Sequence, residues 1–237
     1  MINDVYNFKF DSSVFMEYKD YSDVTVIIPV KNEPMIEEVL KDIINKLKNC
    51  KVIIVYNGNI NIKNNHKNLM QLKQNSNGKG MACVEASKYV KTNIMCFIDG
   101  DKTYEVNDLK KLVELVRNDA DLAIGDRQIT KLDKKVMPDY VKIGNLILTY
   151  IERILYKLDI RDSQTGIRVI KTKVFKKLNI NEKEFGIESE MNIKAKKMNL
   201  KIVEIPVSYY QRSDNARHSK PIGGFKLLWI NLKYLFK

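Results

Sequence analysis

Two kinds of apolar pattern alternate along the first half of the chain. Continuous apolar runs rich in β-branched residues are typical of strands that are buried on both faces of a sheet. They predict strands at VTVIIPV (24–30), KVIIVYNG (51–58), NIMCFIDGD (93–101) and ADLAIGDR (120–127). Apolar residues at helical spacing predict helices over 34–49, 80–90 and 106–118. This β-α-β-α-β-α-β order predicts an α/β fold with a mostly parallel sheet and helices on both faces.

The second half of the chain has a more mixed pattern. Helices are predicted over 140–158 and 187–200, and a strand over 201–209 that ends or kinks near Pro206. The last segment, FKLLWINLKYLFK (225–237), is basic and amphipathic. Its apolar face holds Phe225, Leu228, Trp229, Leu232 and Phe236, and its polar face holds Lys226, Lys233 and Lys237. Such a helix fits either a membrane interface or a groove on the protein core.

Two carboxylates, Asp99 and Asp101, lie at the carboxyl end of the predicted strand at 93–101 with one glycine between them. A turn is one reading, because Asp and Gly are good turn formers. A metal site is the other, because ligands bind beyond the carboxyl ends of parallel strands, and Mg²⁺ and Mn²⁺ prefer carboxylate oxygens. The position at a strand end favours the metal site.

Two further loops carry residues that could bind a nucleotide or a phosphate. One precedes the predicted helix at 80–90, and the other follows the predicted strand at 24–30. NSNGKGMA (75–82) places Lys79 between two glycines, where backbone N–H groups and an ammonium would attract phosphate. A flexible turn is the alternative. IIPVKNEP (27–34) places Asn32 and Glu33 just after the first strand, where an acid can contact a nucleotide or complement the helix dipole.

Basic residues are in excess, with 41 Lys and Arg against 29 Asp and Glu and a net charge of +12 among 237 residues. This excess indicates a polyanionic partner, an anionic membrane or a phosphorylated substrate, or a Lys-rich solvated surface. The segment YYQRSDNARHSKP (209–221) concentrates cations, which suits a diphosphate or a lipid phosphate, or a disordered tail. No known nucleic-acid-reading motif occurs, so no nucleic-acid partner is expected.

Three cysteines without CxxC spacing argue against a disulfide framework and a zinc cluster. The N-terminal segment lacks the apolar core of a signal peptide, and no apolar run approaches the ~20 residues that span a bilayer. These features predict a cytoplasmic protein that is soluble or rests on a membrane surface.

Seven segments occur in an order that resembles family 2 glycosyltransferases, and more narrowly the dolichyl-phosphate mannose or glucose synthase group. Over roughly residues 22 to 224 they are VTVIIPVKNE, NGKGMA, FIDGD, AIGDR, DSQTGIRVI, IESEMNIKAKKMNLKIVEIPVSY and R…SK. The resemblance implies a GT-A fold, a single Rossmann-like domain over 1–237. Within it, 22–127 would bind the nucleotide sugar, 128–215 would form the acceptor half, and 216–237 would be a basic amphipathic tail.

The resemblance also implies roles for individual residues. The catalytic residues would be Asp99, Asp101, Arg127, Asp162 and Arg212, with Asp99 and Asp101 holding Mg²⁺ or Mn²⁺. The predicted substrate-binding residues, which include Asn32, Glu33 and Lys79 of the two loops described above, are Pro29, Asn32, Glu33, Asn57, Lys79, Gln164, Arg168, Glu190, Ser219 and Lys220. Three positions depart from the family pattern. Lys31 replaces a usual aromatic residue, Asn57 replaces the Asp that contacts the base, and Thr103 replaces a Gln that some synthases place near the metal.

The activity implied by the resemblance is inverting transfer of a sugar from a GDP- or UDP-linked donor to a polyprenyl or dolichyl-type phosphate. The enzyme would act as a peripheral protein on the cytoplasmic membrane face. A membrane-anchoring partner or a homo-oligomer is left open. The alternatives are transfer to another acceptor such as a glycan or other lipid, a nucleotidyltransferase, and a non-catalytic membrane-associated subunit.

Overall fold

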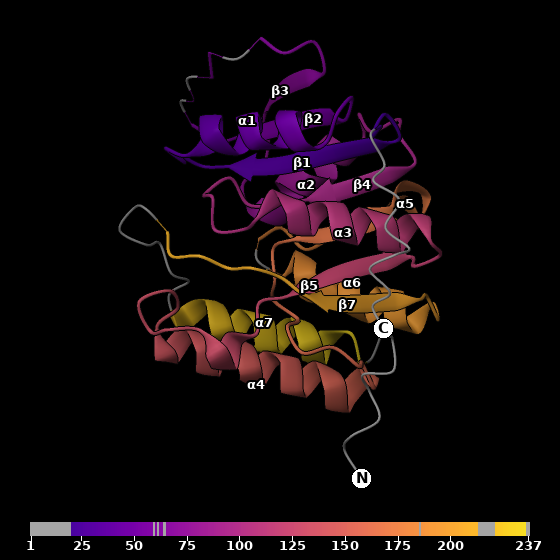
Figure 1. The fold of residues 1–237 in the computed structure, drawn as a ribbon. Helices are drawn as coiled ribbons and strands as arrows, with labels where there is room; N and C mark the ends of the chain where they lie inside the picture. The colour runs from indigo at the N-terminus through magenta and orange to yellow at the C-terminus, as the bar shows by residue number, and fades with distance from the viewer. Residues whose placement is uncertain are drawn as a thin grey trace, which may run out of the picture.

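Seven strands form one sheet in the order β3-β2-β1-β4-β6-β5-β7 in the computed structural model (Figure 1). The structure describes residues 20–58, 60, 62–63, 65–184, 186–212 and 221–235, with backbone alone at 221–226. The strands are β1 (Val24–Val30), β2 (Lys51–Tyr56), β3 (Leu69–Lys73), β4 (Ile94–Phe97), β5 (Leu122–Asp126), β6 (Arg168–Lys171) and β7 (Ile202–Pro206). The helices are α1 (Ile36–Lys46), α2 (Lys79–Ser87), α3 (Val106–Arg117), α4 (Asp139–Tyr156), α5 (Thr172–Leu178), α6 (Ile187–Lys197) and α7 (Pro221–Lys233).

The sheet is mostly parallel, as the alternation of strands and helices predicts. β1 pairs in parallel with β2 and β4, β2 with β3, and β5 with β7. β6 runs antiparallel between β4 and β5. β6 therefore joins the β3-β2-β1-β4 part of the sheet to the β5-β7 part. The division of the chain at 127 and 215 stays a prediction.

Three elements, β3, β6 and α5, were not predicted. β3 is an edge strand in which every residue is partly or fully exposed, so it has no continuous apolar run. β6 has four residues and α5 has seven, and the two elements adjoin at Lys171 and Thr172. Short elements show too few periods of a pattern to be recognised without the tertiary partners that stabilise them.

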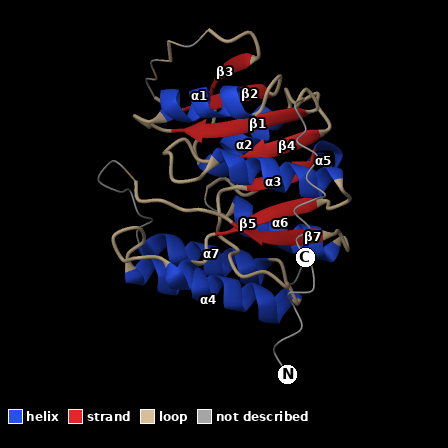
Figure 2. Cartoon of the chain, in the orientation of Figure 1, coloured by secondary structure: helices blue, strands red, loops and turns tan. Residues whose placement is uncertain are grey.

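Helices cover both faces of the sheet (Figure 2). Alternate residues of β1 point to opposite faces, so Val26 and Ile28 pack under α1 and α3 while Ile27 packs with α2 and α6. All three of these side chains are fully buried. The continuous apolar run at 24–30 therefore follows from burial on both faces, as predicted.

The C-terminal helix α7 docks on the core through one face. Ile230 and Tyr234 are 2% and 4% exposed, and the Tyr234 hydroxyl donates a hydrogen bond of 2.5 Å to Glu190 Oε1. A Cβ atom on Gly186 would lie 2.3 Å from Ile230 Cδ1, so the helix sits tightly against the start of α6. Trp229 and Leu232, on the predicted apolar face, are 67% and 39% exposed.

One face of this helix therefore packs on the core, while contact of the exposed face with a membrane stays a prediction. The side chains of Phe225, Lys226, Phe236 and Lys237 lie outside the described residues. Among the helices that the structure describes, none combines the length and apolarity needed to span a bilayer.

Docking of α7 predicts an asymmetric response to alanine substitution. We expect Ile230→Ala to lower the free energy of unfolding by about 2–4 kcal/mol, because a buried side chain leaves a cavity between α7 and α6. Leu232→Ala is the matched control, since a side chain that is 39% exposed should cost below about 1 kcal/mol. Urea unfolding followed by circular dichroism measures both. Equal losses would show that α7 does not dock as described.

Candidate functional site

A cavity of about 520 Å³ opens at the carboxyl ends of β1, β2 and β4. It brings together seven of the residues predicted from the sequence: Pro29, Glu33, Asn57, Lys79, Asp99, Asp101 and Arg212. They come from the end of β1, from the turns after β1, β2 and β4, from the start of α2 and from the segment after β7. Ligands bind at this edge of parallel sheets, and the volume suits a nucleotide-sized ligand.

The paired carboxylates Asp99 and Asp101 lie two and four residues past the end of β4. Thr103 donates to Asp101 Oδ1 from its backbone N–H at 3.1 Å and from its hydroxyl at 2.7 Å, which fixes the orientation of the carboxylate. Thr103, which departs from the family pattern, therefore supports the pair. Gly166 lies directly against Asp99, since a Cβ atom there would be 2.1 Å from Asp99 Oδ2.

Each carboxylate of the pair is matched by one cation. Lys79 Nζ lies 2.7 Å from Asp99 Oδ1 and 3.0 Å from Glu188 Oε1. Arg212 bridges Asp101 Oδ2 and Glu33 Oε2, with both distances 2.7 Å. These two bridges tie the start of α2 and the segment after β7 to the carboxyl end of β4.

Burial and charge shift the pKa values of these groups. Burial raises the pKa of Asp101, and the neighbouring charge of Asp99 raises it further, although Thr103 and Arg212 oppose the shift. Burial disfavours the Lys79 ammonium, but the carboxylates of Asp99 and Glu188 hold the pKa of Lys79 well above its usual range. These two carboxylates therefore favour the charged form of Lys79.

The balance of charge around the pair is negative. Four carboxylates, Glu33, Asp99, Asp101 and Glu188, contact two cations, Lys79 and Arg212. Lys31 and Glu184 also line the cavity, with opposite charges. The Glu188 Oε2 atom is buried without a hydrogen-bond partner in the described part of the chain. Among the described residues these contacts leave two more carboxylates than cations, an excess that suits one divalent cation near Asp99 and Asp101.

Metal ligation by three or more protein side chains is not seen. Within the described residues, no three His, Cys, Asp or Glu side chains converge as ligands of an ion. The donor set here is the pair Asp99 and Asp101, which is the type of site that carboxylates share with substrate phosphates.

The glycine-rich loop before α2 differs in one respect from its prediction. Its backbone N–H groups were expected to attract phosphate, but those of Gly80 and Met81 donate to the carbonyls of Glu184 at 3.1 Å and Lys183 at 3.2 Å. Gly78 has φ +101°, and a Cβ atom there would lie 2.1 Å from the Lys183 carbonyl. The glycines therefore allow two backbone segments to pack closely, and Lys79 provides the positive charge.

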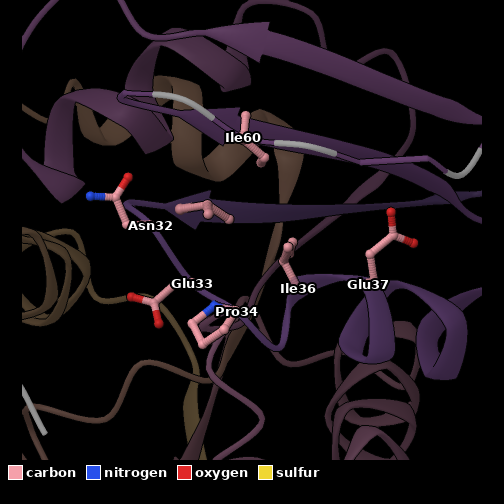
Figure 3. Close-up of a pocket in the computed structure, with 7 residues that line it drawn as sticks. Asn32, Glu33, Pro34, Ile36, Glu37 and Ile60 are labelled. Atoms are coloured by element: carbon pink, nitrogen blue, oxygen red, sulfur yellow. The ribbon is translucent and has the colours of Figure 1, made fainter. Parts of the chain in front are cut away.

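Asn32 lies beside the cavity, in a neighbouring hollow of about 290 Å³ (Figure 3). Asn32 and Glu33 extend from the turn after β1, and Glu37 comes from α1. Glu33 and Val30 line both hollows, whereas Asn32 lines the smaller one. The turn after β1 thus separates the two spaces.

Two of the predicted catalytic residues, Arg127 and Asp162, lie outside the cavity in a buried polar network. Arg127 donates to both carboxylate oxygens of Asp162, at 2.6 Å and 2.7 Å, and its guanidinium lies 5.3 Å from the centre of the Tyr209 ring. Asp162 is fully buried, and Arg127 lines a separate hollow of about 390 Å³. The structure therefore does not bring this pair to the Asp99–Asp101 cavity.

Arg168 and Gln164 belong to the same network. Arg168, 1% exposed, donates to the carbonyls of Thr165 at 2.9 Å and Ser163 at 2.6 Å, and to Asn192 Oδ1 at 2.6 Å. Gln164 donates to Ser189 Oγ at 2.9 Å and to Glu152 Oε1 at 3.3 Å. These bonds hold the loop that carries Gly166, so these residues support the site from behind.

Burial shifts the pKa values of two charged residues in this network. It raises the pKa of Glu152 to about 7, although hydrogen bonds from Ser189 and Asn192 oppose the shift. Burial also lowers the pKa of Arg168, which the nearby Glu188 and Glu152 partly offset. A network of this kind is stable because nearly every buried polar group has a partner.

Of the two acids at positions 188 and 190 of α6, the one predicted to bind substrate, Glu190, does not line the cavity. Glu190 accepts hydrogen bonds from the backbone of Asn181 and Glu182 and pairs with Lys194, away from the cavity. Glu188, which was not singled out, contacts Lys79 instead. Residues two apart on a helix point in different directions, so helical phase was the signal that could have separated them. Asn77 and Gln74 also line the cavity without having been predicted.

Ser219 and Lys220 lie outside the described residues.

A protein-family model described as glycosyl transferase family 2 matches residues 25–178. The chain is 30% identical over 144 residues to glycosyltransferase AglJ of Haloferax volcanii, covering 60% of this chain and 47% of that protein. It is 28% identical over 239 residues to a UDP-N-acetylglucosamine–dolichyl-phosphate N-acetylglucosaminyltransferase of Methanococcus voltae, covering 87% and 93%. It is 26% identical over 229 residues to a dolichol-phosphate mannosyltransferase of Pyrococcus furiosus, covering 90% and 63%. The chain thus spans less than two thirds of the length of several curated relatives.

Among solved structures, glucosyl-3-phosphoglycerate synthase of Mycobacterium tuberculosis matches with a TM-score of 0.65 and 14% identity, covering 90% of this chain and 80% of that one. The same enzyme matches in complex with Mn²⁺, UDP and glucosyl-3-phosphoglycerate, with a TM-score of 0.64. At this identity the similarity concerns the fold, and it confirms the expected GT-A architecture. Since the family model covers more than half of the chain, the protein belongs to glycosyl transferase family 2.

Proposed function

We propose that the protein transfers a sugar from a nucleoside-diphosphate sugar to a polyprenyl phosphate. The observation that carries the proposal is the cavity in which Asp99 and Asp101 meet Lys79 and Arg212. Relatives named as dolichyl-phosphate sugar transferases support the choice of acceptor. A location on the cytoplasmic face of a membrane follows from such an acceptor, as part of the same proposal.

A divalent cation, Mg²⁺ or Mn²⁺, is the proposed cofactor. Asp99 and Asp101 would hold it, and the two surplus negative charges of the site fit its charge. The Mn²⁺ in the complex of the mycobacterial synthase supports this choice. When bound, the ion would neutralise the diphosphate and stabilise it as a leaving group.

The chain's own residues would bind and orient the donor. Lys79 and Arg212 reach the cavity from two sides and are the cations placed to bind diphosphate oxygens. Pro29 and Asn57 line the same cavity and would contact the base, and the Asn57 amide donates to Asn77 at 2.9 Å. GDP- and UDP-linked sugars are both candidates, and the UDP in the mycobacterial complex supports the second.

The acceptor phosphate would attack the anomeric carbon on the face opposite the diphosphate, which inverts the configuration. A phosphate is already anionic at neutral pH, so no residue has to remove a proton before attack. Catalysis would then depend on orientation and electrostatic stabilisation. Glu188, which contacts the Lys79 ammonium at 3.0 Å, would keep Lys79 in place.

We expect Asp101→Asn to lower sugar transfer by at least about 10²-fold, because one of the two carboxylate ligands is lost. EDTA should remove the activity of the unaltered enzyme, and Mn²⁺ or Mg²⁺ should restore it. The measurement is the release of nucleoside diphosphate together with transfer to a polyprenyl phosphate. Asp42→Asn is the control, because the Asp42 side chain is half-buried on α1 and does not line the cavity.

Full activity in EDTA would contradict the proposed role of a divalent cation. Release of pyrophosphate from a nucleoside triphosphate would instead identify a nucleotidyltransferase. A soluble phosphorylated acceptor, tested in parallel, separates lipid-phosphate transfer from transfer to another acceptor.

The close contact between Gly166 and Asp99 gives a second expectation. Gly166→Ala places a Cβ atom 2.1 Å from Asp99 Oδ2, so the carboxylate must move and we expect turnover to fall by at least about tenfold. Gly144→Ala is the matched control, because a Cβ atom there meets nothing within 4 Å. Steady-state transfer and Mn²⁺ titration by calorimetry measure the two effects. Unchanged Mn²⁺ affinity in Gly166→Ala would contradict the role of this contact.

Glu188 and Glu190 form a matched pair for a third expectation. Glu188→Gln removes a charge that contacts Lys79, and should lower turnover by about 10²-fold with little loss of stability. Glu190→Gln should lower the melting temperature, because several hydrogen bonds to its carboxylate weaken, while activity below that temperature is kept. The opposite result would return the substrate-binding role to Glu190, as the family resemblance implies.

A further inference from the structure

The outward face of α4 is apolar where a solvent-facing helix is normally polar. Six of its large side chains are exposed: Tyr140 (56%), Ile143 (57%), Leu146 (37%), Ile147 (54%), Tyr150 (64%) and Ile154 (56%). Five of them, at 140, 143, 147, 150 and 154, recur at alternating steps of three and four and so share one side of the helix over about 21 Å. The opposite side of α4 faces the protein interior, where Leu148, Glu152 and Tyr156 are buried.

Helix α7 extends this apolar surface. α4 and α7 lie side by side as the outermost layer beyond β7 (Figure 1), and the Tyr156 hydroxyl of α4 donates to the backbone carbonyl of Asn231 in α7. Trp229 and Leu232 of α7 are exposed. We call the six exposed α4 side chains, with Trp229 and Leu232, the α4–α7 face. It holds eight of the twelve large hydrophobic side chains that are exposed in the described part of the chain. A concentration of this kind marks an interaction surface.

Cations accompany the α4–α7 face. A hollow of about 580 Å³ lies against α4, with Leu146, Ile147 and Tyr150 on one side. Its other lining residues include Lys131, Arg153 and Arg161, against one acid, Asp126. An apolar surface with aromatic side chains and a cationic border complements an anionic bilayer, in which acyl chains, headgroup dipoles and phosphates lie at successive depths.

We propose that the α4–α7 face docks the protein on an anionic lipid bilayer, with α4 as the principal contact. A second copy of the chain is a weaker candidate, because two chains of net charge +12 repel each other while an anionic bilayer attracts both. The inference extends the proposed function by naming the surface from which a lipid acceptor would be reached. The inference depends on the proposed function for its biological meaning, and it is argued from the exposed side chains of α4 and α7.

Trp229 is the single tryptophan of the chain, so it reports docking without any substitution. With phosphatidylcholine vesicles that contain phosphatidylglycerol, we expect the Trp229 emission to shift to the blue and to be quenched by brominated acyl chains. Vesicles of phosphatidylcholine alone should bind several-fold more weakly, and added salt should weaken binding to the anionic vesicles. Unchanged emission in the presence of anionic vesicles would overturn the proposal.

A double variant tests α4 directly. Ile147→Glu with Ile154→Glu should lower the partition onto anionic vesicles by at least about tenfold in co-sedimentation, since two apolar side chains are lost and two negative charges added. Met70→Glu with Tyr89→Glu is the matched control. These residues are 42% and 50% exposed, and Met70 lies on β3 at the other end of the sheet. Equal losses in both double variants would overturn the role of α4.

Sedimentation velocity without lipid tests the alternative occupant. A dimer that the Ile147→Glu, Ile154→Glu variant splits, with no vesicle binding by the unaltered protein, would assign the α4–α7 face to a second copy.

Activity toward a water-soluble, short-chain polyprenyl phosphate separates this proposal from the proposed function. The variant should keep that activity and lose transfer to long-chain acceptor in vesicles. Vesicle binding without any sugar transfer would refute the function alone, and transfer without vesicle binding would refute the docking surface alone.

Discussion

Repulsion among four carboxylates is the constraint around which the site is built. Glu33, Asp99, Asp101 and Glu188 come from the turn after β1, the end of β4 and the start of α6. Acids that are partly or fully buried destabilise a fold unless cations compensate them. Lys79 and Arg212 do so by bridging two carboxylates each, which ties distant parts of the chain to one edge of the sheet. Among the described residues four carboxylates contact two cations, and this excess of negative charge is what the proposed divalent cation would neutralise.

A second layer of interactions keeps this cluster in place. The loop between α4 and β6 presses Gly166 onto Asp99, and Tyr104 accepts a hydrogen bond of 2.9 Å from the Gly166 N–H. Arg168 and the Arg127–Asp162 pair then fix the rest of that loop from within the core. Arg168 can be buried because backbone carbonyls and Asn192 replace its water. Arg127, Asp162 and Arg168 therefore hold this loop, and their predicted contact with substrate stays a prediction.

The basic excess of the chain has two structural settings. In the cavity, cations are paired with acids and are part of the electrostatics of the site. Along α4, cations border an exposed apolar surface instead. The net charge of +12 would serve the two proposals in different ways, by binding phosphates in the cavity and by attraction to an anionic surface along α4. The two roles are compatible with an enzyme whose donor is soluble and whose acceptor is a lipid.

The local pattern of the sequence determined the parallel core, the position of Asp99 and Asp101 at a strand end, and the order of segments that resembles the family. These features depend on residues close together in the chain, so periodicity and spacing are enough to predict them. β3 and β6 were missed because an exposed edge strand and a four-residue strand are stabilised by their neighbours rather than by their own pattern. For the same reason, the sequence did not separate Glu188 from Glu190, or the buried Arg168 from a cation that lines the cavity. Only the tertiary structure decided those points, because they depend on the direction in which each side chain leaves its helix or strand and on the partners it meets there.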